Sequence, residues 1–161
     1  MGKILITVLI SILPLNNISH PHEEDPFTTY IQEKLIELGY LDVDRFDNVY
    51  ATGVFKSTVD FGGGSVTASG GDFDAFTLKL NSSGVFQWVR TFGDNPGDES
   101  GNDIAAFQRY SSGPFSSINY DNLITVGDFN GTVDFGIGNV TSNSSSADMF
   151  ILKLNFSGNI E

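Results

Sequence analysis

The feature that most constrains how this chain of 161 residues can fold is an internal repeat. Residues 48–87 align with residues 122–161 at a constant offset of 74, without a gap, and 19 of the 40 aligned pairs are identical. Chance would give roughly three identities, even with an allowance for the biased composition. One structural unit therefore occurs nearly twice, and units of this kind bury their apolar faces by stacking on one another.

Both copies carry the pattern of short antiparallel strands. Phe76, Leu78 and Leu80 alternate with other residues, as their counterparts do in the second copy, and this period of two places them on one face of a strand. Segments rich in Gly, Asn and Ser at 62–64 and 81–84 supply the turns. In the first copy we expect strands over about residues 49–54, 58–61 with 66–67, 76–80 and 85–91.

Four motifs of the first copy match a known repeat. They are Asn-Val-Tyr-x-Thr-Gly (residues 48–53), Val-Asp-Phe-Gly-Gly-Gly (59–64), Phe-x-Leu-Lys-Leu (76–80) and Trp-x-x-Thr-Phe-Gly (88–93). These motifs resemble the SBBP-type β-propeller repeat, and the resemblance covers most of residues 41–161. It implies an all-β fold of antiparallel, propeller-like blades in an extracellular or cell-surface protein, with no catalytic residues defined for the repeat.

The chain carries fewer blades than a closed propeller needs. A propeller closes with about four to eight four-stranded blades, whereas the second copy here stops at Glu161, before its last strand. We therefore expect a partial propeller that is either a fragment of a larger protein or completed by oligomerisation. A surplus around Arg109–Tyr120 predicts a projecting loop. The predicted division is 41–107 for the first repeat, 108–121 for the inserted loop and 122–161 for the truncated second repeat.

The N-terminus predicts export. Lys3 precedes an apolar run from Ile4 to Leu15 that ends at polar residues, which is the pattern of a signal peptide over residues 1–19. The run is shorter than the roughly 20 residues of a membrane-spanning helix, so we expect no membrane span. An uncleaved anchor or a buried strand is the alternative interpretation. The sequence thus predicts a secreted or cell-surface protein.

Residues 20–40 are unlike the repeats and predict one short helix. Asp25 and Pro26 are start signals and Gly39 is a stop signal for a helix over about 26–38. Residues 41–44 would then be the last strand of an incomplete preceding blade. Residues 26–58 are also similar to a peptidoglycan-binding helical module. The residues that match that module are Ile31, Gln32, Leu35, Leu38, Gly39, Tyr40, Gly53, Phe55 and Thr58.

Charge and composition exclude several classes of function. The formal net charge is −12 with only 8 Lys and Arg, so no basic patch is available for nucleic-acid phosphates or anionic lipids. The absence of Cys removes thiol nucleophiles and Cys-ligated metals. The two histidines, His20 and His22, sit beside the predicted cleavage point, so we expect no Ser-His-Asp triad. We expect a protein that is not an enzyme.

One acidic segment has the chemistry of a cation site. Asp94, Asp98, Glu99 and Asp103, with nearby Asn side chains, offer the oxygen ligands that Ca²⁺ prefers. Their spacing fits no EF-hand loop, and a solvated turn is the alternative interpretation. Calcium is therefore the one cofactor that the sequence suggests.

Other notable residues are expected to serve the fold. Asp60 and Asp74 recur as Asp134 and Asp148 at equivalent repeat positions, which favours a structural task such as capping a turn or bonding a neighbouring blade. Trp88 is expected in the blade core rather than on a sugar-binding platform.

These observations predict a non-enzymatic binding or scaffolding module at the cell surface. Its expected partners are a protein or glycan at the cell surface and neighbouring propeller blades, in the same chain or by oligomerisation. The alternatives are a peptidoglycan-associated module through residues 26–58 and a calcium-stabilised adhesin segment.

Overall fold

A computed structural model describes residues 40–94, 97–109, 120–143 and 146–161. These residues form antiparallel β-strands joined by turns, which confirms the predicted all-β character. Within these ranges there is no helix, and hence none long and apolar enough to cross a membrane. The predicted signal peptide and the predicted helix at 26–38 lie outside the described residues.

The first copy of the repeat forms a four-stranded sheet with a small hairpin beside it. The sheet order is β1 (Leu41–Val43), β2 (Val49–Phe55), β5 (Asp74–Leu80) and β6 (Phe86–Phe92). The hairpin is formed by β3 (Thr58–Asp60) and β4 (Ser65–Thr67). We call β1 to β6 the first unit. The strands predicted for this copy are confirmed to within two residues at each end.

The second copy repeats this arrangement. Its three-stranded sheet has the order β11 (Asp148–Asn155), β8 (Tyr120–Phe129) and β7 (Glu99–Arg109). Its hairpin is formed by β9 (Thr132–Asp134) and β10 (Asn139–Thr141). We call β7 to β11 the second unit. Strands β9 and β10 begin 74 residues after β3 and β4, so the sequence offset is also the structural one.

The sequence suggested that residues 41–44 end a preceding blade, and this prediction is wrong. Strand β1 belongs to the first unit, where it pairs with β2. Leu41 of β1 pairs with Ala51 of β2, and in the second unit Ile104 of β7 pairs with Thr125, the equivalent of Ala51. Strands β1 and β7 are thus matching first strands, 63 residues apart rather than 74. This difference in spacing explains why the sequence copies align only from residue 48 onward.

The extra residues of the second unit fall in the β7–β8 hairpin, where the sequence predicted a projecting loop. Part of the surplus lengthens the two strands, since Arg109 still pairs with Tyr120. Residues 110–119 lie outside the described residues. The sequence assigned residues 41–107 to the first repeat, and this range contains most of β7. Strand β7 nevertheless pairs with β8, so it belongs to the second sheet. The second sheet therefore begins before the second sequence copy, which starts at residue 122.

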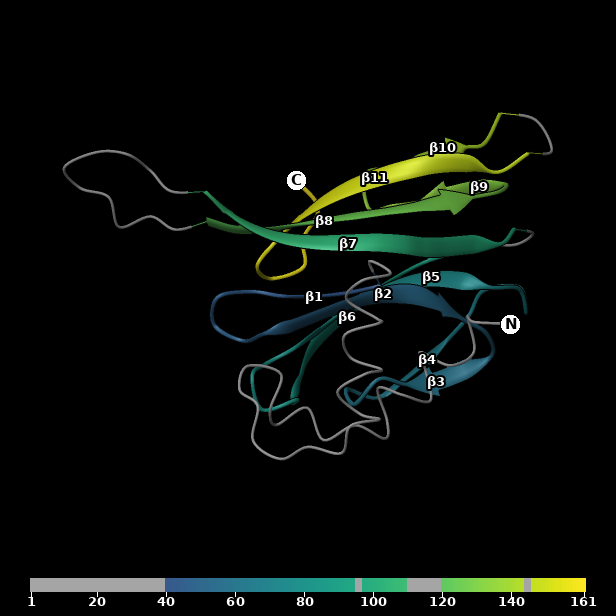
Figure 1. Cartoon of the computed structure of the whole chain (residues 1–161). Helices are drawn as coiled ribbons and strands as arrows, with labels where there is room; N and C mark the ends of the chain where they lie inside the picture. Colours follow the sequence, from purple (N-terminus) through teal and green to yellow (C-terminus); the bar gives the residue numbers. More distant parts are fainter. Residues whose placement is uncertain (1–39, 95–96, 110–119, 144–145) are drawn as a thin grey trace.

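The two sheets stack face to face (Figure 1). Strand β7 packs across β1, β2 and β5, so the second unit covers one face of the first. The approach is closest at Gly101 of β7, where the Cβ of any other residue would collide with Oγ1 of Thr52. Asp42 of β1 also accepts a hydrogen bond from the Ala106 amide of β7 at 2.7 Å. Among the described strands no sheet closes on itself.

Each unit has an aromatic core beneath its hairpin. Phe61 packs on Phe55 and Phe76 with ring centroids 5.5 and 4.9 Å apart. The equivalent rings of the second unit repeat this arrangement at 5.4 and 5.0 Å. The second core also takes in three buried residues of the first unit: Tyr50, Ala75 and Phe92. The same sequence pattern thus builds the same local core twice, and stacking adds a further layer to one copy.

Candidate functional site

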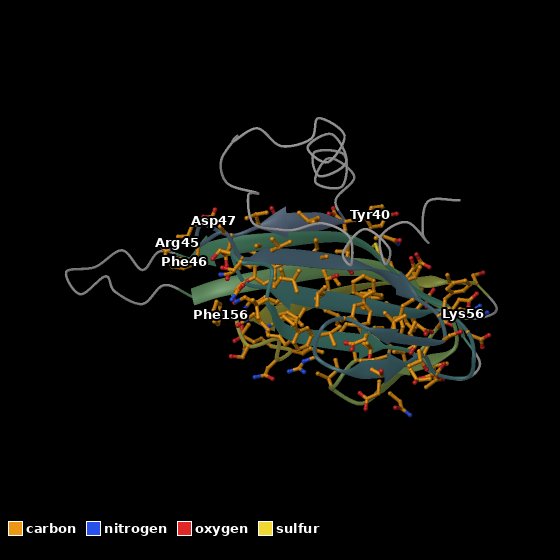
Figure 2. The ribbon with its side chains drawn as sticks, turned by 90° about the horizontal axis from the view of Figure 1, so that it is seen from below. Tyr40, Arg45, Phe46, Asp47, Lys56 and Phe156 are labelled. Carbon is orange, nitrogen blue, oxygen red and sulfur yellow. The ribbon has the colours of Figure 1, made fainter. Side chains whose placement is uncertain are left out.

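The predicted cation ligands lie in and after the link that joins the two units. Asp94 and Asp98 belong to the link between β6 and β7, Glu99 opens β7, and Asp103 lies further along β7. This link starts at the end of the first sheet where β2 and β6 both finish, marked by Lys56 in Figure 2. The acidic side chains are therefore placed where the chain passes from one unit to the other.

Hydrogen bonds from the link hold both units. The Asp98 carboxylate accepts a hydrogen bond from the amide of Phe73 in the first unit at 3.1 Å. The main-chain carbonyl of Asp98 accepts one from the amide of Asn130 at 3.2 Å. Oδ2 of Asp94 accepts from the amide of Thr132 in the second unit at 3.1 Å. Two of the predicted ligands thus already have a structural task.

Glu99 differs from its neighbours because its carboxylate is buried without a partner. The residue is 1% exposed, and no described residue donates a hydrogen bond to either carboxylate oxygen. Burial raises the pKa of Glu99 to about 8, and repulsion from Asp94, Asp74 and Asp98 adds to the rise. The backbone amide of Asp94 lowers the pKa in part, although it does not reach hydrogen-bonding geometry. An ionised carboxylate here is unfavourable unless a proton or a cation neutralises it.

A second unpartnered oxygen lies close to Glu99. Oδ1 of Asp94 is buried, and no hydrogen-bond donor reaches it from the described part of the chain. The Cβ of any side chain at Gly97 would collide with the carbonyl oxygen of Asn130, and it would lie 2.9 Å from Oε1 of Glu99 and 3.1 Å from Oδ1 of Asp94. Glycine at this position therefore lets three oxygen atoms converge on one small space.

Asp103 lies apart from this group. The register of β7 shifts between Gly101 and Asp103, and the Asp103 side chain is exposed, with Oδ1 accepting from the amide of Ile104 at 2.7 Å. Of the four predicted ligands, Asp94, Asp98 and Glu99 lie close together, whereas Asp103 lies apart from them. In the described part of the chain, no three His, Cys, Asp or Glu side chains are arranged to hold a metal ion.

Asp74 is a member of the acidic group that the sequence assigned to the fold alone. Its carboxylate accepts from the amide of Ser69 at 3.0 and 3.1 Å, and its repeat equivalent Asp148 accepts from the amide of Asn143 at 2.7 Å. The predicted structural role is therefore confirmed. Burial also raises the pKa of Asp74. Its closeness to Glu99 could not be read from the repeat, because β7 lies outside the aligned copies.

The other recurring aspartate caps a turn in both units. Oδ1 of Asp60 accepts from the amides of Gly62 and Gly64 at 2.8 and 3.0 Å. Asp134 makes the same two hydrogen bonds at 2.7 and 3.0 Å. Gly62 and Gly64 have φ of 102° and 110°, a conformation that glycine adopts without strain. The structural interpretation of this repeated residue is confirmed.

Trp88 is partly buried at the contact between the two units, whereas the sequence predicted a place in the core of a blade. It packs against the second core, and its Nε1 donates to the carbonyl of Phe156 at 3.1 Å. Arg90 donates from Nε to the carbonyl of Gly158 at 2.6 Å. Nζ of Lys79 lies 3.1 Å from the centroid of the Phe156 ring, which is labelled in Figure 2. Residues from β5 and β6 thus clasp the turn that follows β11.

Comparisons of this chain with family models, curated proteins and solved structures gave no match. The resemblance to the SBBP-type repeat therefore stays a prediction that rests on its four motifs. Two features of the chain itself bear on its function: the stacking of two similar units and the buried acidic group in their link.

Proposed function

We propose that this chain is a non-enzymatic repeat module of an extracellular or cell-surface protein, and that it binds or scaffolds by stacking its sheets on a further sheet. One comparison within the molecule carries the proposal. The first unit has a face that the second unit covers, while among the described residues nothing covers the same face of the second unit. An apolar face left open in this way is typical of an interaction site.

Matching positions on the two sheets show how different the two faces are. Ala75 and Thr77 of β5 are each 1% exposed beneath the second unit. Met149 and Ile151 of β11, which follow them by 74 residues, are 74% and 63% exposed. The second unit thus presents larger apolar side chains at positions that are buried in the first unit.

These exposed residues are part of a continuous surface. Ile151 pairs with Val126 of β8, and side chains directly opposite each other in an antiparallel pair share a face. Their sequence neighbours alternate into the second core, so this face points away from the first unit. We define the open face by its four apolar side chains Ile124, Val126, Met149 and Ile151. Asp128 and Lys153, which pair with Met149 and Ile124, lie on the same face.

The occupant that fits the open face is a further unit of the same repeat. On the matching face of the first unit the occupant is β7, with Gly101 at the closest approach and the apolar residues Ile104 and Ala106 beside it. A partner for the open face would present a similar strand. In a solution of this chain alone, a second copy supplies that unit. Successive stacking of such sheets is how propeller blades are added, which supports the predicted partial propeller.

The peptidoglycan-associated alternative gains no support from the described residues. Gly53, Phe55 and Thr58, which match that helical module in sequence, lie in strands β2 and β3. The corresponding strands β8 and β9 recur in the second unit without such a module before them. The strands are thus explained by the repeat.

The proposal is tested by the solution mass of the chain, measured by light scattering after size exclusion. We expect the wild type to associate, and the double variant Met149→Lys/Ile151→Lys to be a monomer because two charges enter the open face. Val85→Lys is the matched control, since Val85 is 56% exposed and lies outside the open face. A monomeric wild type at every concentration, or equal association of the double variant, would overturn the proposal.

A further inference from the structure

The buried carboxylate of Glu99 needs a positive partner that the described residues do not supply. The charged groups that act on it most strongly are Asp94, Asp74 and Asp98, and all three are acidic. Carboxylates are found buried when they are paired, hydrogen-bonded or bound to a metal ion. Within the described ranges no donor forms a hydrogen bond with the Glu99 carboxylate, so the second of these means of compensation is missing there.

Three oxygen atoms near Gly97 lie close together. Oε1 of Glu99, Oδ1 of Asp94 and the carbonyl oxygen of Asn130 all lie within 3.1 Å of the point where a side chain at Gly97 would begin. Any two of these oxygen atoms are therefore at most about 6 Å apart, which is close to the roughly 5 Å between two oxygen atoms on opposite sides of one Ca²⁺. Neither carboxylate oxygen accepts a hydrogen bond from a residue that the structure describes, so binding a cation would break no such bond at these atoms.

Two neighbouring carboxylates, unlike that of Glu99, accept hydrogen bonds from main-chain amides of described residues. Asp74 is held by the amide of Ser69, and Asp98 is held by the amide of Phe73. They therefore add negative charge around the location, and at least one oxygen of each carboxylate is already hydrogen-bonded. Negative charge from several carboxylates strengthens the attraction of a divalent cation.

We propose that Glu99, Asp94 and the main-chain carbonyl of Asn130 form a calcium site beside Gly97. All three proposed ligands are oxygen atoms, which Ca²⁺ prefers. Metals that prefer nitrogen or sulfur ligands would find none among them. Calcium accepts about six to eight ligands in flexible geometry, and water completes sites with few protein ligands. The site uses only two of the four acidic residues that the sequence pointed to.

Such a site would fasten the two units to each other. Asp94 belongs to the link, Glu99 opens β7, and Asn130 follows β8 in the second unit. The link is bound to the first unit through the hydrogen bond from Phe73 to Asp98. A bound cation would therefore draw together the start of the second sheet, the turn after its second strand and the segment that leads from the first sheet.

The test is calorimetric titration of the full chain with CaCl₂, together with thermal melting in calcium and in chelator. We expect one ion per chain and a melting midpoint raised by roughly 5–10 °C when free calcium is about 100 times the dissociation constant. Extracellular calcium modules bind with dissociation constants of about 10⁻⁴–10⁻³ M, so absence of binding up to about 10 mM would overturn the proposal.

Two variants locate the site. Glu99→Gln keeps the shape of the side chain, and we expect it to lose calcium binding and the calcium-dependent rise in midpoint. Asp103→Asn removes a charge from the same acidic segment outside the site, and we expect it to bind calcium like the wild type. Binding that survives Glu99→Gln, or that disappears equally in Asp103→Asn, would overturn the assignment. Titration of the wild type decides the question even if a variant does not fold.

Discussion

The two units of this molecule have similar local structures and different surroundings. Both have a sheet, a small hairpin and a core of three phenylalanine rings. In the first unit the face that carries Ala75 is buried, whereas in the second unit the face that carries Met149 is open. Local sequence therefore determines the strands and turns of each unit, while the burial of each face depends on its neighbour.

The difference in burial between the two sheets is tested most directly by placing the same charge at matching positions of both. We expect Ala75→Lys to lower the free energy of unfolding by more than about 3 kcal/mol, because the charge would be buried between the units. Met149→Lys should change it by less than about 0.5 kcal/mol, because that position is exposed. Urea unfolding followed by circular dichroism, at a protein concentration where both variants are monomers, measures the difference. Equal effects would mean that the units do not stack in solution.

The second prediction concerns pH and tests the link between the units. In the presence of chelator, the free energy of unfolding should fall as pH rises from about 4.5, the ordinary pKa of Glu, to about 8, the pKa of Glu99 in the folded chain. Between these values the folded chain keeps a proton that the unfolded chain has lost, so rising pH favours unfolding. Stability should level off above this range.

Glu99→Gln is the control for this pH dependence. The variant cannot ionise at this position, so its stability should vary much less over the same range. In this variant a smaller fall in stability with rising pH should remain, because burial raises the pKa of Asp74 as well. Denaturant midpoints measured between pH 5 and pH 9 check both statements, and an unchanged slope in the variant would assign the pH dependence to other groups.

The third prediction tests the closest approach of the two sheets. Gly101→Ala should destabilise the chain by about 1–3 kcal/mol, because its Cβ would collide with Oγ1 of Thr52. Thr52→Ala removes that oxygen, so the double variant should lose less stability than the sum of the two single variants. A double-mutant cycle by urea unfolding measures this coupling. Strict additivity would indicate that these residues do not meet.

Much of the local structure could be predicted from the sequence because it depends on near neighbours. Alternation of Phe76, Leu78 and Leu80 defines a strand through its period of two, and the strand is present. The recurrence of Asp60 at an equivalent position predicts a shared structural role, and both copies show the same pair of hydrogen bonds. Neither inference requires knowledge of what lies on the other side of the sheet.

The candidate site could be predicted only in part because it depends on which strands meet. The acidic composition of residues 94–103 pointed to Glu99, but nothing in the spacing shows that its carboxylate is buried and that of Asp103 exposed. The place of β1 was missed for a related reason. An insertion before β8 breaks the repeat offset, so the matching first strands are hidden from alignment.

The last prediction is that matching substitutions in the turns of the two units lower the free energy of unfolding equally. Asp60→Ala and Asp134→Ala should each cost about 0.5–1.5 kcal/mol, since each removes an acceptor from the same two turn amides. Both turns are exposed, so stacking should not alter the cost, in contrast to the pair Ala75 and Met149. Denaturation midpoints of the two variants, measured side by side, check this. A markedly larger loss for one of them would show that the neighbouring unit reaches even the turns, and that the copies are less independent than their hydrogen bonds indicate.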